Sequence, residues 1–380
     1  MRKNLFATWV LSLGLAIAGR GPAAAQVTLT STTPLTPAPH TFVTLRPVTI
    51  GGTVYYPFAF EGHIHSSPYS MDARHPPLDI LNAAERLGLD AIVLTDHGSS
   101  RGRREFPKYR GTLVPFVGRE IGGDFGHAVI WNVEADDGMV SATTSLQQRC
   151  NWAHKHGGLL IWAHPGWWIE GNDRDPMEWM TPAALRRKGA AGDIDAIEIW
   201  NGVYRGPLLK LIDHWLRVLE AGVYVPVVGN SDFHRFSSHH LGQAHSIAFC
   251  DKDDVKNCLW PAVREGRIVI SDGPYASLSV NDKLPGSVLV GPTQPLTVKV
   301  DAQSNEVGTL QLYVGREIVH TLPITPGQRT NATWKVPVPN SDSYVRIDIL
   351  RTQRRPGQTP ISLLSNPVII DVGTPRPAWR

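Results

Sequence analysis

Histidine and carboxylate residues recur between residues 60 and 240 in spacings that suit the chemistry of metal ions. His63 and His65 are separated by one residue, and Asp232 and His234 repeat that spacing. In an extended strand, residues i and i+2 point to the same side, so both members of such a pair can reach one ion. Nitrogen and oxygen donors suit Zn²⁺, Mn²⁺ or Fe²⁺ and argue against Cu(I). The two pairs therefore predict a site for divalent metal ions.

Further candidate ligands stand next to other short apolar stretches, which we expect to be strands. A lone histidine is usually a structural residue, so none of these positions means much by itself. Together they are informative, because so many polar groups at one edge of a sheet would be costly to bury without a compensating cation. The segments concerned are Glu61, Thr95-Asp96-His97, Gly118-Arg119-Glu120, His127, Ala163-His164-Pro165, Glu198 and Asn201-Gly202.

Seven short apolar segments and three amphipathic segments are the elements that would position these residues. The predicted strands are 57–60, 91–94, 113–117, 128–131, 158–162, 196–199 and 224–228, and the predicted helices are 77–87, 145–155 and 208–221. Alternating strands and helices predict a parallel sheet, and seven such strands favour closure into a barrel. In that architecture the carboxyl ends of the strands build the active site.

The pattern changes near Gly266, where helical periodicity gives way to short alternating segments. Arg267–Ser271 is one more predicted strand, and Asp272-Gly273-Pro274 is a turn signal. Later predicted strands are 296–300, 309–314, 331–336, 344–350 and 367–372. We therefore predict an α/β fold in two domains: a barrel over residues 57–274 and an all-β sandwich over residues 275–380.

The first 25 residues have the features of a secretory signal peptide. Arg2 and Lys3 are followed by the apolar segment Leu5–Ala18, and Ala23–Ala25 offers a cleavage site. An uncleaved anchor is the alternative, although the segment is shorter than the ~20 residues that span a bilayer. We expect a periplasmic or secreted protein without stable membrane insertion, in which residues 26–56 form a lead-in segment.

Composition narrows the classes of partner and leaves the state of the cysteines open. The net charge is only +3, and the basic residues form no long stripe, so a nucleic-acid partner is not expected. An oxidising compartment permits a disulfide between Cys250 and Cys258. The alternative is three buried thiols, and Cys150 is left over in either case.

Five of the motifs together resemble the PHP (polymerase and histidinol phosphatase) superfamily of metallohydrolases. The likeness covers Phe58 to about Phe249. It rests on His63-x-His65, Thr95-Asp96-His97, Glu120 followed by His127, Ala163-His164-Pro165 and Asp232-x-His234. More narrowly, the chain is similar to the carbaryl-hydrolase-type CehA/McbA branch, which is exported and joins a C-terminal β-sandwich through a Gly-Arg…Asp-Gly-Pro stretch. Here that stretch runs from Gly266 to Pro274, although the chain is shorter than we expect for that branch.

The resemblance implies a distorted (βα)₇ PHP barrel that holds two to three divalent ions. His63, His65, Glu120 and Asp232 would hold the first ion. Glu120 would bridge to a second ion, which also takes His127 and His164. Asp72, His97 and His234 would hold the third. The family often has Ser-Asp-Gly where this chain has Met71-Asp72-Ala73, so Asp72 departs most from the pattern.

Bound ions of this kind would give hydrolysis through a metal-bridging hydroxide. A water between two cations loses its proton near neutral pH, and the same cations stabilise the charge that develops on the substrate. Asp96 is expected to fix a neighbouring imidazole. Glu198 is either a proton shuttle or a hydrogen-bond acceptor behind a ligand, with a fortuitous exposed carboxylate as the third interpretation.

Two sets of side chains point to different substrates, both of them small molecules with an ester-type bond. Trp162, Trp167, Trp168 and Trp200 would form an apolar wall for an aryl or acyl group, unless they pack under the loops. Arg101, Arg103, Arg104, Arg119 and Arg205 would instead grip a phosphate or carboxylate. Export favours a carboxyl or carbamate ester. The alternatives are a phosphoesterase and a non-catalytic protein that binds carbohydrate or the envelope.

Overall fold

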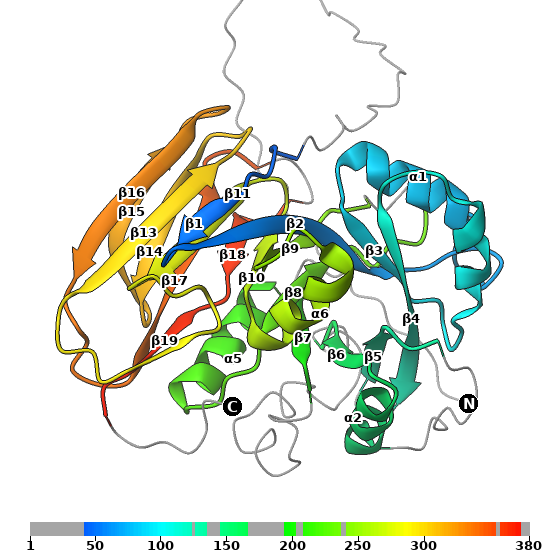
Figure 1. The fold of residues 1–380 in the computed structure, drawn as a ribbon, viewed down its shortest axis with the longest axis horizontal. Coiled ribbons are helices and arrows are strands. Elements are labelled where there is room, and N and C mark those ends of the chain that lie inside the picture. Colours follow the sequence, from blue (N-terminus) through cyan, green and yellow to red (C-terminus); the bar gives the residue numbers. More distant parts are fainter. Residues whose placement is uncertain are drawn as a thin grey trace, which may run out of the picture. The chain divides into compact units, whose positions relative to one another are not determined.

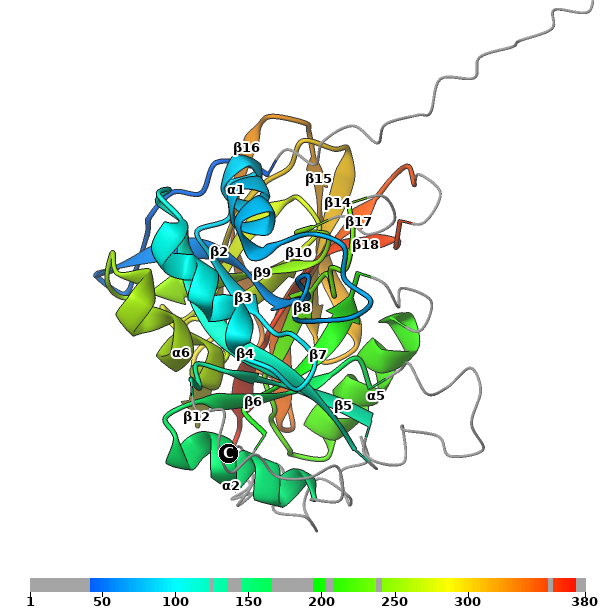
Figure 2. The ribbon, with the colours of Figure 1, turned by 90° about the vertical axis from the view of Figure 1, so that its right-hand side faces the viewer.

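The computed structural model describes residues 42–123, 126–134, 145–165, 194–202, 208–236, 241–354 and 358–373. Residues 39–380 belong to one compact unit. The predicted signal peptide and most of the lead-in segment lie outside the described residues. Within the described part of the chain, no helix is long and apolar enough to cross a membrane. The strands form a sixteen-stranded sheet and a three-stranded sheet (Figures 1 and 2).

Seven consecutive positions in the large sheet are taken by the strands that the apolar segments predict. These strands are β2 (Thr53–Ile64), β3 (Ala91–Leu94), β4 (Val114–Gly123), β5 (Gly126–Trp131), β6 (Leu159–Ala163), β7 (Ala196–Asn201) and β8 (Val227–Asn230). The pairs β2–β3, β3–β4, β6–β7 and β7–β8 are parallel, as expected. Buried Val, Ile, Leu and Ala residues dominate β3, β6 and β8, as is usual for strands covered on both faces.

The expectation of a parallel sheet is wrong at β5, which runs antiparallel to both β4 and β6. Gly123 pairs with Gly126, so only two residues separate β4 from β5. A crossover between parallel strands needs a dozen or more residues, and a connection this short permits only a hairpin. As a consequence, the start of β5 lies at the same edge of the sheet as the end of β4.

Local signals place the helices. α1 (Pro77–Leu87) begins with proline at its first position and ends at Gly88, whose φ of 88° is left-handed. α2 (Leu146–Lys155) begins with a capping box in which the Ser145 hydroxyl accepts the Gln148 N–H. α5 (Leu208–Glu220) buries one apolar face. Within the described ranges, two helical elements were not predicted from the sequence, η1 (Arg101–Lys108) and α6 (Val255–Glu265).

β9 (His245–Cys250), which the sequence patterns did not indicate, joins the two halves of the large sheet. It pairs antiparallel with β2 on one side and with β10 (Ile268–Ser271) on the other. A disulfide links Cys250 at its end to Cys258 in α6, which settles the state of these two cysteines. Cys150 is buried in α2.

The C-terminal strands continue the same sheet from β10. They are β18 (Ile361–Ser365), β17 (Ser343–Arg351), β19 (Val368–Asp371) and β12 (Val288–Val290), with β14 (Gly308–Val314) and β15 (Glu317–Ile324) attached through β17. β11 (Tyr275–Val280), β13 (Leu296–Gln303) and β16 (Arg329–Val336) form the smaller sheet, and β1 (Val48–Ile50) pairs with β2. Figure 1 shows β2 running between the site-bearing strands and these C-terminal strands.

The mixed α/β character of the chain is confirmed, whereas its finer description stays a prediction. The Gly229 N–H of β8 donates to Ser246 Oγ of β9 at 3.0 Å. The last of the seven strands, β8, therefore lies beside β9, which pairs with the first of them, β2. The closed seven-stranded barrel, the separate sandwich and the boundary at residue 274 remain predictions.

Candidate metal centre

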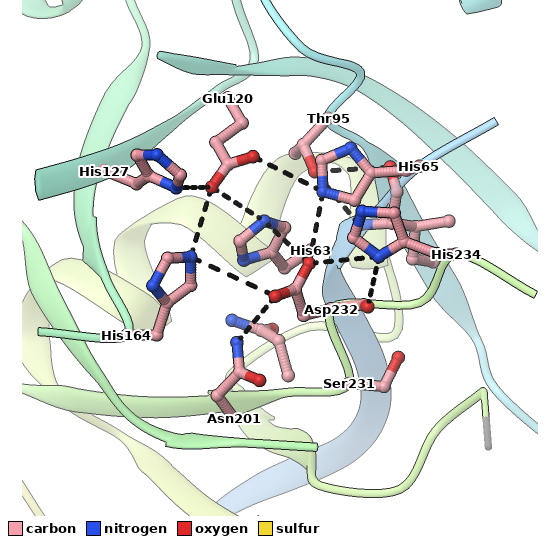
Figure 3. A network of polar contacts seen from close by, with 12 residues as sticks. His63, His65, Thr95, Glu120, His127, His164, Asn201, Ser231, Asp232 and His234 are labelled. Carbon is pink, nitrogen blue, oxygen red and sulfur yellow. Dashed lines mark hydrogen bonds and ion pairs between the residues drawn. The ribbon is translucent and has the colours of Figure 1, made fainter. Parts of the chain in front are cut away.

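Two buried carboxylates, Glu120 in β4 and Asp232 just after β8, lie at the centre of the histidine cluster (Figure 3). The imidazole of His63 joins them, because its Nε2 is 3.4 Å from Glu120 Oε1 and 3.4 Å from Asp232 Oδ1. Residues that are 57 to 169 positions apart in the sequence therefore meet at the predicted edge of the sheet.

Glu120 is surrounded by imidazoles on both of its oxygens. Its Oε1 also lies 2.8 Å from His127 Nδ1 and 3.2 Å from His164 Nε2. Its Oε2 lies 2.8 Å from His97 Nδ1 and 3.5 Å from His65 Nε2. His127 reaches this position because β5 is antiparallel, which sets His127 opposite Gly122 of β4 and Ala163 of β6. A carboxylate whose two oxygens each lie among imidazole nitrogens is suited to bridge two metal ions.

Asp232 faces a second set of partners. Its Oδ1 lies 3.2 Å from His65 Nε2 and 3.6 Å from His234 Nδ1, while its Oδ2 lies 4.0 Å from His164 Nε2. Asn201 Nδ2 donates to Oδ2 at 3.2 Å. Asp232 has a φ of 54° and His164 a φ of 28°, a left-handed conformation that is uncommon for residues other than glycine. Backbone strain of this kind clusters at functional sites.

The outer side of the cluster is formed by Asp72, His97 and His234. Asp72 Oδ2 lies 3.0 Å from His97 Nε2 and 3.2 Å from His234 Nε2. The side chains of Asp72 and His97 are 54% and 41% exposed, in contrast to 0% for His63 and His65. This side of the cluster is therefore its most exposed part.

Neighbouring strands hold the segment that carries His63 and His65. Thr95 Oγ1 accepts the Ile64 N–H at 3.0 Å and donates to the Ile64 carbonyl at 3.3 Å. The His65 N–H donates to the Phe233 carbonyl, and the Phe233 N–H donates to the His63 carbonyl. These bonds keep both imidazoles on one side of β2, as the i, i+2 spacing predicts.

Two carboxylates support these segments from behind. Both oxygens of Glu61 accept the Ser231 N–H, at 2.8 and 3.0 Å, and burial raises the pKa of Glu61 to about 8. Asp96 accepts the Ser66 N–H at 2.6 Å and the Ser70 hydroxyl at 2.9 Å, and burial raises its pKa to about 6. Ser70 Oγ lies 3.3 Å from His65 Nδ1, so Asp96 reaches an imidazole only through Ser70.

Burial and the neighbouring charges shift the pKa values of the imidazoles and carboxylates of the cluster in different directions. Burial by itself lowers the pKa of His63, but the nearby carboxylates of Asp232 and Glu198 raise it well above its usual range. Burial lowers the pKa of His65 to about 4. Burial would raise the pKa of Glu120, yet the imidazoles hold it well below its usual range. Glu120 and Asp232, whose pKa the imidazoles lower in the same way, therefore stay ionised.

The residues present fit divalent metal ions. His63 Nε2, His65 Nε2 and Asp232 Oδ1 are buried and make no hydrogen bond within the described part of the chain. Such atoms are costly to bury unless a partner satisfies them, and a cation would do so. The groups with ligand atoms close enough for one ion are His63–His65–Glu120, His63–His164–Asp232, Glu120–His127–His164 and His65–His97–His234.

The structure therefore brings all nine predicted ligands together, and it changes one detail of their grouping. His65 stands with His97 and His234 as well as with His63 and Glu120. Asp72, the predicted ligand that departs most from the PHP pattern, contacts His97 and His234 from the exposed side. Which of these residues bind a metal stays a prediction.

Several polar residues of the site have roles that the sequence did not predict. Glu61, Thr95 and Asn201, which were candidate ligands, form hydrogen bonds behind the centre, and the hydroxyls of Ser66 and Ser70 and the amide of Asn230 were not singled out. Asn201 and Asn230 end β7 and β8, so a polar residue at a strand end was the available signal. The serines follow His65 in a loop and carried no such signal.

The predicted substrate contacts of the tryptophan and arginine side chains are the predictions that the structure changes most. Trp162 and Trp200 are 1% and 2% exposed in an apolar core, so neither can line a substrate wall. Arg119 is 1% exposed and its guanidinium lies over the Trp152 ring, so it cannot grip a substrate. Trp167, Trp168 and Arg205 lie outside the described residues.

Comparison with solved structures agrees with this fold. A two-domain protein from Bacteroides vulgatus, described as containing a predicted PHP-like metal-dependent phosphoesterase, matches with a TM-score of 0.50 and 17% identity, over 85% of this chain and 98% of that chain. The present chain shares its fold. An amidohydrolase from Chromobacterium violaceum matches with a TM-score of 0.38 and 16% identity, over 55% of this chain and 96% of that one. No family model and no curated protein matches the chain.

Proposed function

We propose that the protein is a metal-dependent hydrolase of the PHP type that cleaves an ester-type bond in a small molecule. The observation that carries this proposal is the buried Glu120–Asp232 pair, with imidazole nitrogens on both carboxylates. The buried carboxylates and imidazoles are suited to bind cations. The exposed residues Asp72 and His97 beside them leave room for a substrate to approach those cations.

Bound divalent ions would supply Lewis acidity and lower the pKa of a coordinated water. The chain itself would hold the ions through the residues of the centre and keep Glu120 and Asp232 ionised. The exposed edge formed by Asp72 and His97 is where a substrate would arrive, because the opposite side is closed by β2 and β8. Zn²⁺, Mn²⁺ and Fe²⁺ all suit these donors.

We place phosphoesters first among the substrates, ahead of carboxyl and carbamate esters. The apolar wall that favoured an aryl ester loses Trp162 and Trp200 to the core. Gly102, within the basic segment that favours a phosphate, lies close to the supporting residue Asp96, since a Cβ on Gly102 in η1 would be 2.7 Å from Asp96 Oδ2. Arg101 and Arg104 on either side of Gly102 are exposed. Export remains part of the proposal, supported by the Cys250–Cys258 disulfide.

The decisive experiment is metal analysis combined with a substrate panel. Purified protein loaded with Mn²⁺ or Zn²⁺ is assayed on nitrophenyl phosphate, bis(nitrophenyl) phosphate, naphthyl acetate and a naphthyl carbamate, with His63→Ala as the control. We expect bound metal and turnover of the phosphates. Turnover of only the carboxyl or carbamate esters would reverse the order of substrates. Absence of bound metal together with absence of hydrolysis would favour a binding protein.

A further inference from the structure

For Glu198 in β7 the sequence left three interpretations: a proton shuttle, a hydrogen-bond acceptor behind a ligand, and a fortuitous exposed carboxylate, the last of which is wrong. Its side chain is 0% exposed. Oε2 accepts from His63 Nδ1 at 2.9 Å and from Asn230 Nδ2 at 2.8 Å, and Oε1 accepts from Asn201 Nδ2 at 2.7 Å. A proton shuttle must exchange protons with substrate or water, whereas both oxygens of Glu198 are taken by fixed donors. Its surroundings therefore suit a structural acceptor.

The contact with Glu198 determines how His63 faces the cluster. With Nδ1 directed at the carboxylate, Nε2 faces the other side of the ring, where the neutral imidazole would present its lone pair to a cation. That nitrogen is the one that lies 3.4 Å from both Glu120 and Asp232. A carboxylate on the far nitrogen is the arrangement that orients metal-binding histidines and raises their basicity.

Asn201 links Glu198 to Asp232 through hydrogen bonds. Its Nδ2 donates to Glu198 Oε1 at 2.7 Å and to Asp232 Oδ2 at 3.2 Å. With Oδ2 held there, Oδ1 faces the imidazoles of His63 and His65. Figure 3 shows Asn201 beside Asp232, on the side away from Glu120.

Asn230 closes the network through the backbone. Its Nδ2 donates to Glu198, and its Oδ1 accepts the Gly62 N–H at 2.8 Å, next to His63 in the chain. Three strands, β2, β7 and β8, are thus joined through one carboxylate. Glu198 therefore contacts His63 directly and reaches Asp232 through Asn201.

We propose that Glu198, Asn201 and Asn230 form a positioning unit that sets the orientation of His63 relative to Asp232, and so the affinity of the inner metal position. This inference rests on the proposed metal centre. Glu198 is then a positioning residue and takes no part in proton transfer to the substrate.

The test uses Glu198→Gln, which keeps the shape of the side chain but turns one oxygen into an amide donor. We expect metal affinity, measured by competition with a chromophoric chelator, to fall about 10- to 100-fold. The absorption spectrum of the Co²⁺-loaded variant should change as well, because His63 is reoriented. Glu317→Gln on the exposed edge of β15 is the matched control and should bind as the wild type does.

The outcomes separate this inference from its rivals. Unchanged metal affinity and an unchanged Co²⁺ spectrum in Glu198→Gln, with one limb of the pH–rate profile lost, would overturn it in favour of a shuttle. A wild type that binds no metal would overturn the proposed function itself. If Glu198→Gln does not fold, Asn201→Ser gives the same decision, since it withdraws the long amide from Asp232 but leaves Glu198 on His63. Wild-type affinity in that variant contradicts the inference.

Discussion

The side chain of Asn366 pairs with both backbone groups of Val227. Its Oδ1 accepts the Val227 N–H at 2.9 Å, and its Nδ2 donates to the Val227 carbonyl at 2.8 Å. Asn366 lies between β18 and β19 and is 0% exposed, while Val227 begins β8, the strand that leads to Asp232. A residue from the C-terminal part of the chain therefore completes the hydrogen bonding of a site-bearing strand.

Replacing Asn366 by alanine should destabilise the protein and loosen the site. The substitution leaves two buried backbone groups of Val227 without partners, at a cost of about 1–3 kcal/mol each. We expect urea denaturation to show a loss of about 2–6 kcal/mol in the free energy of unfolding. The exposed Asn340→Ala is the control. Equal stability of the two variants would show that Val227 finds other partners.

Replacing Asp72 by alanine should remove one ion and leave the inner ones. Asp72 and His97 are about half exposed. Water weakens the attraction between an exposed charged group and a metal ion, so these residues should hold an ion less tightly than the buried ones do. Metal analysis after dialysis should show about one ion fewer per chain in Asp72→Ala. Glu120→Gln should lose most of the metal, because Glu120 contacts both sides of the cluster. Equal losses in the two variants would contradict a graded centre.

Adding a methyl group at Gly62 should damage the site from behind. A Cβ there would lie 2.2 Å from the Trp131 ring and 2.8 Å from Asn230 Oδ1, and Trp131 is buried and donates to the Gly62 carbonyl. Overpacking of this kind costs about 1–3 kcal/mol. We expect Gly62→Ala to lower the melting temperature and the metal content together. Gly122→Ala, whose Cβ would lie 3.5 Å from His127, should keep its melting temperature.

Asp90 should make the free energy of unfolding fall as pH rises from about 4 to 6. Burial raises the pKa of Asp90 to about 6, above the 3.8 of the unfolded chain, although its carboxylate accepts the Ala59 N–H at 2.8 Å. The folded chain therefore binds more protons in this window, and its stability declines as they leave. Partial exposure limits the effect to about 1–2 kcal/mol.

The comparison of wild type with Asp90→Asn isolates this contribution. The amide keeps an acceptor for Ala59 but cannot ionise, so the variant should gain stability over the wild type as pH rises and hold that gain above pH 6. Urea denaturation between pH 4 and 8 measures the difference. The exposed Asp251→Asn should show no such trend. A gap that is independent of pH would mean that Asp90 titrates normally in the folded state.

The shared orientation of His63 and His65 could be predicted from the sequence because its signal is local. His63 and His65 share one side of a strand through the period of two, whatever surrounds them. α1 begins at Pro77 and ends before Gly88, because proline suits the first position of a helix and glycine suits its left-handed cap.

The direction of β5 and the residues behind the centre were decided only by tertiary structure. Apolar periodicity marks a strand but carries no information on the neighbour with which it pairs, so the hairpin that sets His127 beside Glu120 was not foreseen. The roles of Glu198 and Asn201 depend on which side chains other strands bring within 3 Å. Asn366 could be assigned to Val227 only once the sheet had brought together residues 139 positions apart. Local propensity specifies the elements and their polar ends, whereas long-range packing specifies which of those ends meet.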